Sequence, residues 1–390
     1  MKDGWEIKKL GEVCEIQGGA TPKRTEPLYW EGGTYPWFTI EDIRKQGRYI
    51  NDTQQKITKL AWEKSRIFPK DTVLLCCTAS IGEYALTCIP LTTNQQFNGL
   101  VIKDKSYLTP KYLMHYCSTI KQNLLMLSGK ATIDFVSADK VKKLPIPIPP
   151  LPEQERIVSE LDCINGILEK KREQIKELDA LAQSIFYHMF GDPVTNEKGW
   201  EVRKLGDISM VKIGPFGSLL HTSDYISGGI PLVNPVHMQE EKICPDIDFT
   251  VSDEKLLELQ NYILQEGDIV FARRGDIGRC ALVGNAENGF LCGTGSLYVR
   301  LLHDINRTFF LKLMRSPSMI KQLNSFAKGA TMLNINCKII EDLIVPLPPL
   351  SLQQSFATKI EAIEKQKELI KRSIAEVETL LASRMQHYFG

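Results

Sequence analysis

The sequence lacks the features of membrane proteins, of secreted disulfide-rich proteins and of common metal sites. It has no run of about 18 apolar residues, and the stretch from Met1 to Leu10 is too polar for a signal peptide. Its 10 cysteines include no C-x-x-C pair and no His/Cys spacing typical of a metal site, and Cys76 and Cys77 are adjacent. We therefore expect a cytoplasmic protein with reduced cysteines, no membrane partner, no cofactor and no metal.

Motifs for nucleotide binding and catalysis are also missing. Neither G-x-x-x-x-G-K-[ST] nor G-x-G-x-x-G occurs, and the 6 histidines form no cluster with ligand spacing. Asp246, Asp253, Glu254 and Lys255 fit a loose pattern for a metal-dependent nuclease, but an exposed polar loop before a helix explains them better. We predict no catalytic residue and keep a stand-alone metal-dependent nuclease as the weaker alternative.

The sequence also has almost no excess of charge. It contains 48 Lys and Arg against 47 Asp and Glu. Residues 1–151 hold 21 against 15, a net +6, whereas residues 191–350 hold 16 against 19, a net −3. A protein that binds nucleic acid through counterion release alone is normally strongly basic. If this chain binds DNA, specific contacts or the charge of a partner must contribute.

Internal repetition is what the sequence has in abundance. At 390 residues it is longer than one core usually supports. Segments of the first half return in the same order in the second half, which indicates one module present twice. The matched segments are Gly4–Val13 with Gly199–Ile208, Lys70–Leu75 with Gly267–Ala272, and Lys130–Leu151 with Gly329–Leu350.

Each module ends in a proline-rich lead-in and a long heptad pattern. Because proline lacks an N–H, we expect the central helix to begin only after Pro152. From there apolar residues recur at alternating steps of four and three, as in a coiled-coil seam, and the same positions 199 residues later are again mostly apolar. Such a helix of roughly 38 residues would be about 55 Å long and needs a partner along its length. The repeated pattern favours a partner within the chain over a zipper between two chains. The predicted seam positions are Ile157, Leu161, Ile164, Leu168, Lys171, Ile175, Leu178, Ala182, Ile185 and Met189, and Phe356, Ile360, Ile363, Lys367, Ile370, Ile374, Val377, Leu381, Arg384 and Tyr388.

The rest of each module indicates a mixed α/β domain. Apolar runs such as TVLLCC and DIVFARR predict strands, and residues 110–127 and 307–326 have helical spacing. We predict an α/β (α+β) fold with two homologous globular domains, separated by two long antiparallel helices that form an intramolecular coiled coil with pseudo-two-fold symmetry. The expected boundaries are 1–151 and 191–350 for the domains, and 152–190 and 351–390 for the helices.

These motifs resemble the specificity subunit of Type I restriction-modification systems over the whole chain. Each half opens with G-W-x-x-x-x-L-G, and the first lead-in contains P-P-L-x-E-Q at Pro149–Gln154. The second lead-in departs from this motif, because Leu352 replaces the glutamate. The resemblance implies two target recognition domains that each recognise one half of a bipartite site in double-stranded DNA. It also implies helices that set the gap and bind two methyltransferase subunits, restriction (translocase/endonuclease) subunits in the full complex, and no catalytic residues in this chain.

Candidate DNA-binding residues come from Gly-rich or polar turns. Arginine can contact guanine edges or phosphate, and Asn or Gln amides can pair with adenine. A non-catalytic coiled-coil scaffold is the other alternative, although it would not need two divergent domains with such turns. The predicted DNA-binding residues are Lys23, Arg24, Arg44, Lys45, Arg48, Asn94, Gln95, Gln96, Lys130 and Thr132 in the first domain, and Arg273, Arg274, Arg279, Lys328 and Thr331 in the second.

Overall fold

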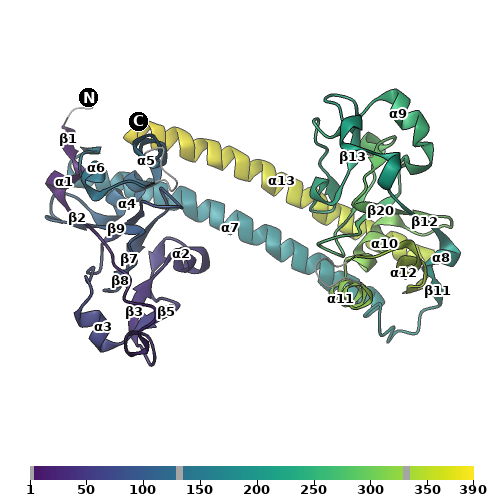
Figure 1. Ribbon diagram of the computed structural model, residues 1–390, viewed down its shortest axis with the longest axis horizontal. Helices are drawn as coiled ribbons and strands as arrows, with labels where there is room; N and C mark the ends of the chain where they lie inside the picture. The colour runs from purple at the N-terminus through teal and green to yellow at the C-terminus, as the bar shows by residue number, and fades with distance from the viewer. Residues whose placement is uncertain (1–3, 129–134, 328–333) are drawn as a thin grey trace. The chain divides into compact units, whose positions relative to one another are not determined.

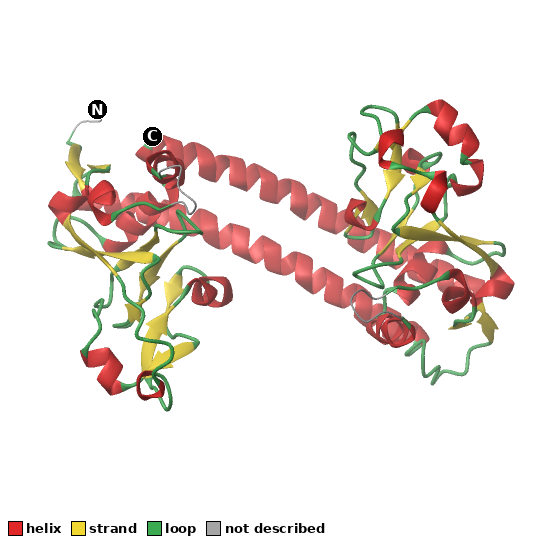
Figure 2. Ribbon diagram, in the orientation of Figure 1, coloured by secondary structure: helices red, strands yellow, loops and turns green. Residues whose placement is uncertain are grey.

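The structure, a computed structural model, describes all residues except 1–3, 129–134 and 328–333. It divides into two compact units, Met1–Arg172 with Ser373–Gly390, and Glu173–Arg372. Each unit contains one globular domain together with part of the long helix α7 (Leu151–Phe190) and part of the long helix α13 (Leu350–Phe389) (Figure 1). Among the residues that the structure describes, strands occur only in the globular parts (Figure 2). Within the described ranges no helix is long and apolar enough to span a bilayer.

The first unit is built on a five-stranded sheet with the order β2-β9-β6-β7-β4, in which only the β4–β7 pair is parallel. A three-stranded sheet, β5-β3-β8, stands beside it, and β1 pairs with β10. The strands are β1 (Glu6–Lys9), β2 (Cys14–Gly18), β3 (Tyr35–Phe38), β4 (Tyr49–Ile50), β5 (Gln55–Ile57), β6 (Val73–Cys76), β7 (Tyr84–Thr87), β8 (Thr92–Thr93), β9 (Phe97–Ile102) and β10 (Pro145–Ile148). The helices are α1 (Leu10–Val13), η1 (Pro27–Tyr29), α2 (Ile40–Gln46), α3 (Lys59–Glu63), α4 (Pro110–Thr119), α5 (Lys121–Leu127) and α6 (Ala138–Lys142).

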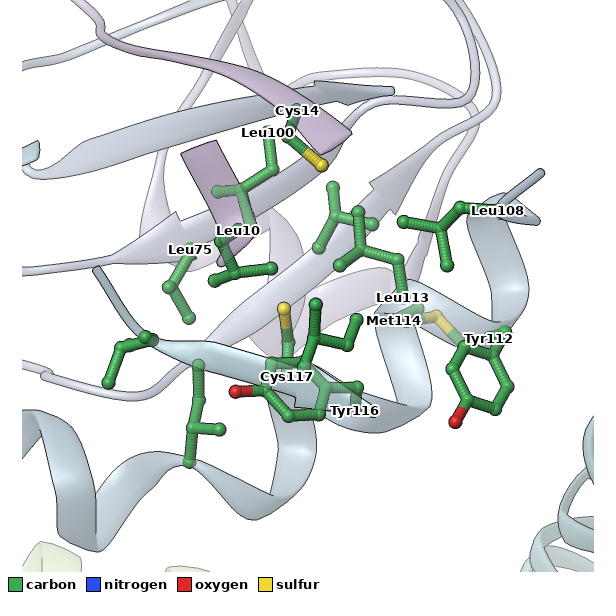
Figure 3. Packing of buried hydrophobic residues seen from close by; sticks show 14 of the residues in the cluster. Leu10, Cys14, Leu75, Leu100, Leu108, Tyr112, Leu113, Met114, Tyr116 and Cys117 are labelled. Carbon is green, nitrogen blue, oxygen red and sulfur yellow. The ribbon is translucent and has the colours of Figure 1, made fainter. Parts of the chain in front are cut away.

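Strand β6 is buried on both faces, which explains its uninterrupted apolar sequence. Val73 and Leu75 point into the core that α4 covers, and Leu74 and Cys76 point into a second core on the opposite face. Figure 3 shows Tyr112, Leu113 and Tyr116 of α4 among the residues of the first core. The predicted strand and the predicted helical spacing of residues 110–127 are both confirmed, and that segment forms the two helices α4 and α5.

The second unit repeats this plan. Its main sheet has the order β12-β20-β17-β18, a smaller sheet has the order β16-β13-β19, and β14 and β15 form a separate hairpin. The strands are β11 (Val202–Lys204), β12 (Ser209–Ile213), β13 (Ile230–Val233), β14 (Met238–Gln239), β15 (Lys242–Ile243), β16 (Thr250–Val251), β17 (Ile269–Ala272), β18 (Cys280–Leu282), β19 (Leu291–Cys292), β20 (Ser296–Leu301) and β21 (Ile344–Pro346). The helices are α8 (Leu205–Ile208), η2 (Gly217–Leu219), η3 (Thr222–Asp224), η4 (Pro235–His237), α9 (Asp253–Glu258), η5 (Gln260–Tyr262), η6 (Asn285–Glu287), α10 (Arg307–Met314), α11 (Pro317–Phe326) and α12 (Cys337–Glu341).

Strand pairing corrects the sequence register of the repeat by one residue. Val73 of β6 pairs with Leu100, and its structural counterpart Ile269 of β17 pairs with Val299. In this alignment Asp71 is the equivalent of Gly267, whereas the sequence comparison had aligned Lys70 with Gly267. Both Asp71 and Gly267 have a positive φ, +68° and +90°. The turn before the strand therefore fixes how the two copies align, which the pattern of apolar residues alone did not.

In each unit the two long helices run antiparallel, as predicted. In the first unit Glu160 of α7 pairs with Arg384 of α13 at 2.9 Å, and in the second Asp179 pairs with Lys367 at 2.7 Å. The predicted seam is buried or half-buried in the structure apart from Arg384, which is exposed. The sequence pattern missed Phe186 and Phe190, which are buried and pack on other aromatic rings.

The prediction that α7 begins only after Pro152 was wrong. The helix begins at Leu151, so Pro152 lies within its first turn. A proline is tolerated there because the N–H groups of the first turn have no intrahelical acceptor.

A buried glutamine explains the lead-in motif of each module. Gln154 accepts a hydrogen bond from the backbone N–H of Thr109, the N-cap of α4, and donates to the carbonyl of Pro149. Gln353 makes the equivalent bonds with Asn306, the N-cap of α10, and with Pro348. Each glutamine thus ties a long helix to the globular domain that precedes it, and the glutamate that the second motif lacks is not needed for these bonds.

Candidate nucleic-acid interface

Four loops of the second unit meet at one end of the main sheet. They follow β12 (214–216), β13 (234–237) and β17 (273–279), and precede β20 (293–295). Backbone bonds join them: Gly214 N–H donates to the Ser296 carbonyl at 3.0 Å, and Arg273 N–H donates to the Gly295 carbonyl at 3.0 Å. The Asn234 side chain accepts from the Gly295 N–H at 3.2 Å. We call this group of loops the second loop cluster.

Glycines in this cluster mainly allow the loops to approach one another. A Cβ on Gly214 would lie 2.0 Å from the Gly293 carbonyl oxygen, and a Cβ on Gly293 would lie 2.2 Å from the Asn234 side-chain oxygen. Gly278 faces Ile320 and is also needed for packing. Gly275 differs, because it has φ +76° and open space around its Cβ position. Of the two glycines in RRGDIGR, it is the one beside which a ligand could approach the backbone.

Arg273 is buried, with only 9% of its surface exposed. Its Nε donates to the Asn334 side chain at 3.4 Å, and no carboxylate contacts it in the described part of the chain. Burial and the charge of Arg274 both lower the pKa of its guanidinium. An arginine nevertheless stays charged, and a buried charge without an anion is costly. The site is therefore suited to an anion from outside the chain.

The other two predicted arginines differ in their surroundings. Arg274 is exposed, and its side chain makes no ion pair with any described residue. Arg279 is half-buried, pairs with Asp276 at 2.8 Å and donates to the Pro235 carbonyl at 3.1 Å. Arg274 is thus available to a ligand, whereas Arg279 holds two loops of the cluster together.

The first unit has a matching loop cluster with different chemistry. Gly19 N–H donates to the Phe97 carbonyl, and Cys77 N–H donates to the Gln96 carbonyl. The Asn94 and Gln96 side chains bond to each other at 3.0 Å, and Gln95 accepts from the Thr21 hydroxyl at 2.6 Å. The three predicted amides therefore lie in one cluster with fixed orientations. In the corrected register Cys77 and Thr78 stand where Arg273 and Arg274 stand in the second unit.

The predicted basic residues of the first domain are spread over several environments. Arg24 lies over the Trp30 ring at 3.9 Å and donates to Gln55 at 2.8 Å. Arg48 pairs with Glu83 at 2.7 Å and lies over Tyr84, which indicates a role in holding the fold. Arg44 is exposed and pairs with Glu41, and Lys23 and Lys45 are exposed. Lys130, Thr132, Lys328 and Thr331 lie outside the described residues.

A family model for the Type I restriction modification DNA specificity domain matches residues 2–178 and 197–379. The chain belongs to this family. Type I specificity proteins are also the curated relatives that it resembles. It is 28% identical over 377 residues to the MjaIX specificity subunit of Methanocaldococcus jannaschii, covering 92% of this chain and 86% of that protein. It is 31% identical over 230 residues to the EcoprrI specificity subunit of Escherichia coli, and this match covers 55% of this chain and 57% of that protein.

Solved structures of this family share the fold. The chain superposes on a chain of a type I R-M system with a TM-score of 0.64 and 19% identity, covering 100% of this chain and 98% of that one. The S subunit from M. genitalium gives a TM-score of 0.55 at 15% identity, with coverage of 100% and 97%. The predicted architecture of two domains and two long antiparallel helices is confirmed as that of Type I specificity subunits.

Two exposed apolar residues of the second loop cluster were missed by the sequence reasoning. Phe216 follows β12 and is 58% exposed, and Val236 lies in the Asn234 loop and is 68% exposed. An exposed aromatic between two glycines, as in GPFG, was the signal available in the sequence. The suggested nuclease acids do not form a metal site in the structure: no group of three or more His, Cys, Asp or Glu suited to a metal occurs among the residues that it describes.

Proposed function

We propose that this chain is the non-catalytic DNA-recognition subunit of a Type I restriction-modification complex in the cytoplasm. In that complex it binds double-stranded DNA, two methyltransferase subunits and, in the full assembly, restriction subunits. The observation that carries this proposal is that one arrangement of loops occurs in both units with different polar side chains: the loops after β2 and β12, after β6 and β17, and before β9 and β20 are joined by equivalent backbone hydrogen bonds. Each globular domain then recognises one half of an asymmetric, interrupted DNA site, and the long helices set the gap.

The two clusters suit different bases. Arg274 can donate two hydrogen bonds to a guanine, whereas the amides of Asn94, Gln95 and Gln96 offer both donors and acceptors, as adenine requires. In this proposal the guanidinium of Arg273 binds a phosphate, which positions the second domain without contributing sequence information. Both kinds of contact are needed because the second domain has a net charge of −3 and gains little from nonspecific attraction.

We expect the isolated chain to bind DNA weakly and the complex with methyltransferase subunits to bind it strongly. The near-neutral charge of this chain supplies few counterion-releasing contacts, so a partner must provide many of them. Gel shifts with a random-sequence duplex pool, with and without the methyltransferase subunits, test this. Equal nanomolar affinity in both cases would contradict the expected dependence on partners. No shift in either case would favour the scaffold, and Mg²⁺-dependent cleavage by the chain alone would favour the nuclease.

Replacing Arg274 is expected to relax base preference at one position of the second half-site. An Arg274→Met variant loses a bidentate contact worth about 1–3 kcal/mol of discrimination, and the other positions should keep their preference. Selection from a duplex pool with the assembled complex measures this. Arg203→Met is the matched control. Arg203 is an exposed arginine of β11 in the same unit, pairs with Glu201 and is not part of the second loop cluster. An unchanged site for Arg274→Met would exclude Arg274 from base recognition.

A further inference from the structure

The hairpin between β14 and β15 has an unusual turn. Both central residues, Glu240 and Glu241, have positive φ, +47° and +69°. Two-residue hairpin turns of this kind favour Asn-Gly, because a residue with a Cβ is strained at positive φ. Glutamate has no local advantage here, so contacts elsewhere in the structure must account for it.

Glu241 contacts two cations of the recognition domain. Its carboxylate lies 2.7 Å from Lys312 Nζ on α10 and 3.0 Å from Arg315 Nε. The side chains of Glu241 and Lys312 are only 21% and 16% exposed. Glu240 pairs with Lys371 of α13 but is 73% exposed. Exposed ion pairs contribute little to folding stability, whereas removal of one partner from a shielded pair costs more free energy. Of the two turn residues, Glu241 therefore makes the stronger contact with the rest of the unit.

The ion pairs continue from Lys312 into both long helices. Lys312 Nζ lies 3.6 Å from Glu364 of α13, Glu364 lies 3.1 Å from Lys367, and Lys367 lies 2.7 Å from Asp179 of α7. Lys367 is a seam residue that is 9% exposed. Burial disfavours its charged form, but the hydrogen bond to Asp179 and the charge of Glu364 outweigh burial and raise the pKa of the ammonium. Charges of alternating sign thus connect the hairpin, α10, α13 and α7, and we call this series the charge chain.

Every member of the charge chain except Glu364 lines a cavity of about 410 Å³ between the second domain and its helices. Gln183, Phe186 and Tyr187 of α7 form another part of the wall. The interface between the second domain and the two long helices is therefore not filled by apolar side chains along its whole length. The ion pairs lie where this packing is absent. Directional contacts across a cavity fix an angle more strongly than they add stability.

The first domain is joined to its helices differently. Asp162 of α7 lies 2.8 Å from both Lys111 and His115 of α4. Between β3 and β4 the first domain has helix α2 instead of the hairpin. The charge chain is thus a feature of the second unit, in which the recognition domain is tied to α7 and α13 together.

We propose that Glu241 and Lys367 are positioning residues that hold the second recognition domain at one angle on the helix pair, and that they thereby restrict the complex to one gap length. This inference rests on the proposed function. A polar residue in a coiled-coil seam commonly fixes register at some cost in stability, which is the role assigned here to Lys367. Glu241 transmits that register to the domain through Lys312.

Methylation by the full chain in complex with its methyltransferase subunits tests the proposal. The probes are duplexes that carry the mapped half-sites with the native gap or with one base pair more or fewer. In Glu241→Gln, which keeps the shape of the side chain and removes its charge, discrimination against the altered gaps should fall about tenfold, because one partner of a shielded ion pair is lost. The half-site sequences should not change. The matched control Glu240→Gln alters the neighbouring residue of the same turn and should change discrimination less than twofold.

Lys367→Met separates positioning from stability. A methionine suits the seam, so the melting temperature should not fall, yet discrimination between gaps should weaken as in Glu241→Gln. This variant also decides the matter if Glu241→Gln does not fold. Wild-type discrimination in a folded Glu241→Gln complex, or equal loss in Glu240→Gln, would overturn the inference while leaving the proposed function intact. A wild-type complex that methylates no bipartite site would overturn the proposed function itself.

Discussion

A chain with one heptad inserted in each long helix is expected to direct methylation to sites whose gap is about three base pairs longer. The insertions follow Lys170 and Ile374, which lie opposite each other in the register set by Glu160 and Arg384. Seven residues restore the a/d pattern, so the seam stays in phase. At about 1.5 Å per residue the helices lengthen by roughly 10 Å, close to three base pairs at about 3.4 Å each. The half-sites should stay the same, because the loop clusters are untouched.

Binding by the lengthened chain should be weaker than that of the wild type. Three base pairs rotate the groove by roughly 100°, given about 10 to 10.5 base pairs per turn, so the DNA or the helices must twist to compensate. Mapping of methylated sites measures both gap and half-sites. A heptad inserted in α7 alone is the control, and it should abolish methylation because the seams become unequal. An unchanged gap, or new half-site bases with the old gap, would show that the helices do not set the distance.

The sequence was most informative where one physical pattern extended over many residues. The heptad positions and their copies 199 residues later predicted two long helices, because a seam of that length has no other common explanation. The sequence pattern missed Phe186 and Phe190, since these rings lie beside the α7 seam positions and are covered by Phe309 of the globular domain as well as by the seam residue Phe356. A residue's position on a helix does not specify which domain will cover it.

Candidate site residues were harder to rank, because their environment depends on loops from four places in the chain. The run RRGDIGR gave three equivalent arginines, but the fold buries Arg273, exposes Arg274 and pairs Arg279 with Asp276. Similarly, Arg48 looked like a surface cation and instead packs on Tyr84. Charge and glycine content selected the candidate residues, and tertiary contacts decide which of their side chains remain exposed.

The repeat also exposes a difference in how the two domains fill one core position. Asp268 is 1% exposed, and both its oxygens bond to Arg300, at 2.8 and 2.7 Å. It also accepts from the backbone N–H of Gln265 at 2.8 Å. In the corrected register Thr72 and Val101 occupy the places of Asp268 and Arg300. The first domain therefore builds the same sheet without an ion pair.

A proline explains the exchange of Asp for Thr. Pro69 stands in the place of Gln265 and has no N–H to donate, so a carboxylate at position 72 would lack that bond. Thr72 instead donates its hydroxyl to the Pro69 carbonyl at 2.7 Å. Each residue matches the hydrogen-bonding group that its own turn presents.

Arg300→Val is expected to destabilise the second unit by about 3–5 kcal/mol, because it leaves the Asp268 carboxylate buried without its cation. The double variant Asp268→Thr/Arg300→Val, which copies the first domain, should recover to within about 1 kcal/mol of the wild type, since a buried ion pair can often be replaced by neutral residues at little cost. Hydrogen exchange of the β17 and β20 amides measures both effects. Loss of about 3 kcal/mol corresponds to a more than hundredfold faster exchange through unfolding, at about 1.4 kcal/mol per factor of ten. The amides of β6 and β9 in the first unit serve as the control within the same chain and should be unchanged. If the double variant exchanges as fast as the single one, the ion pair contributes more than the neutral pair can replace, and the two domains do not share one interchangeable core.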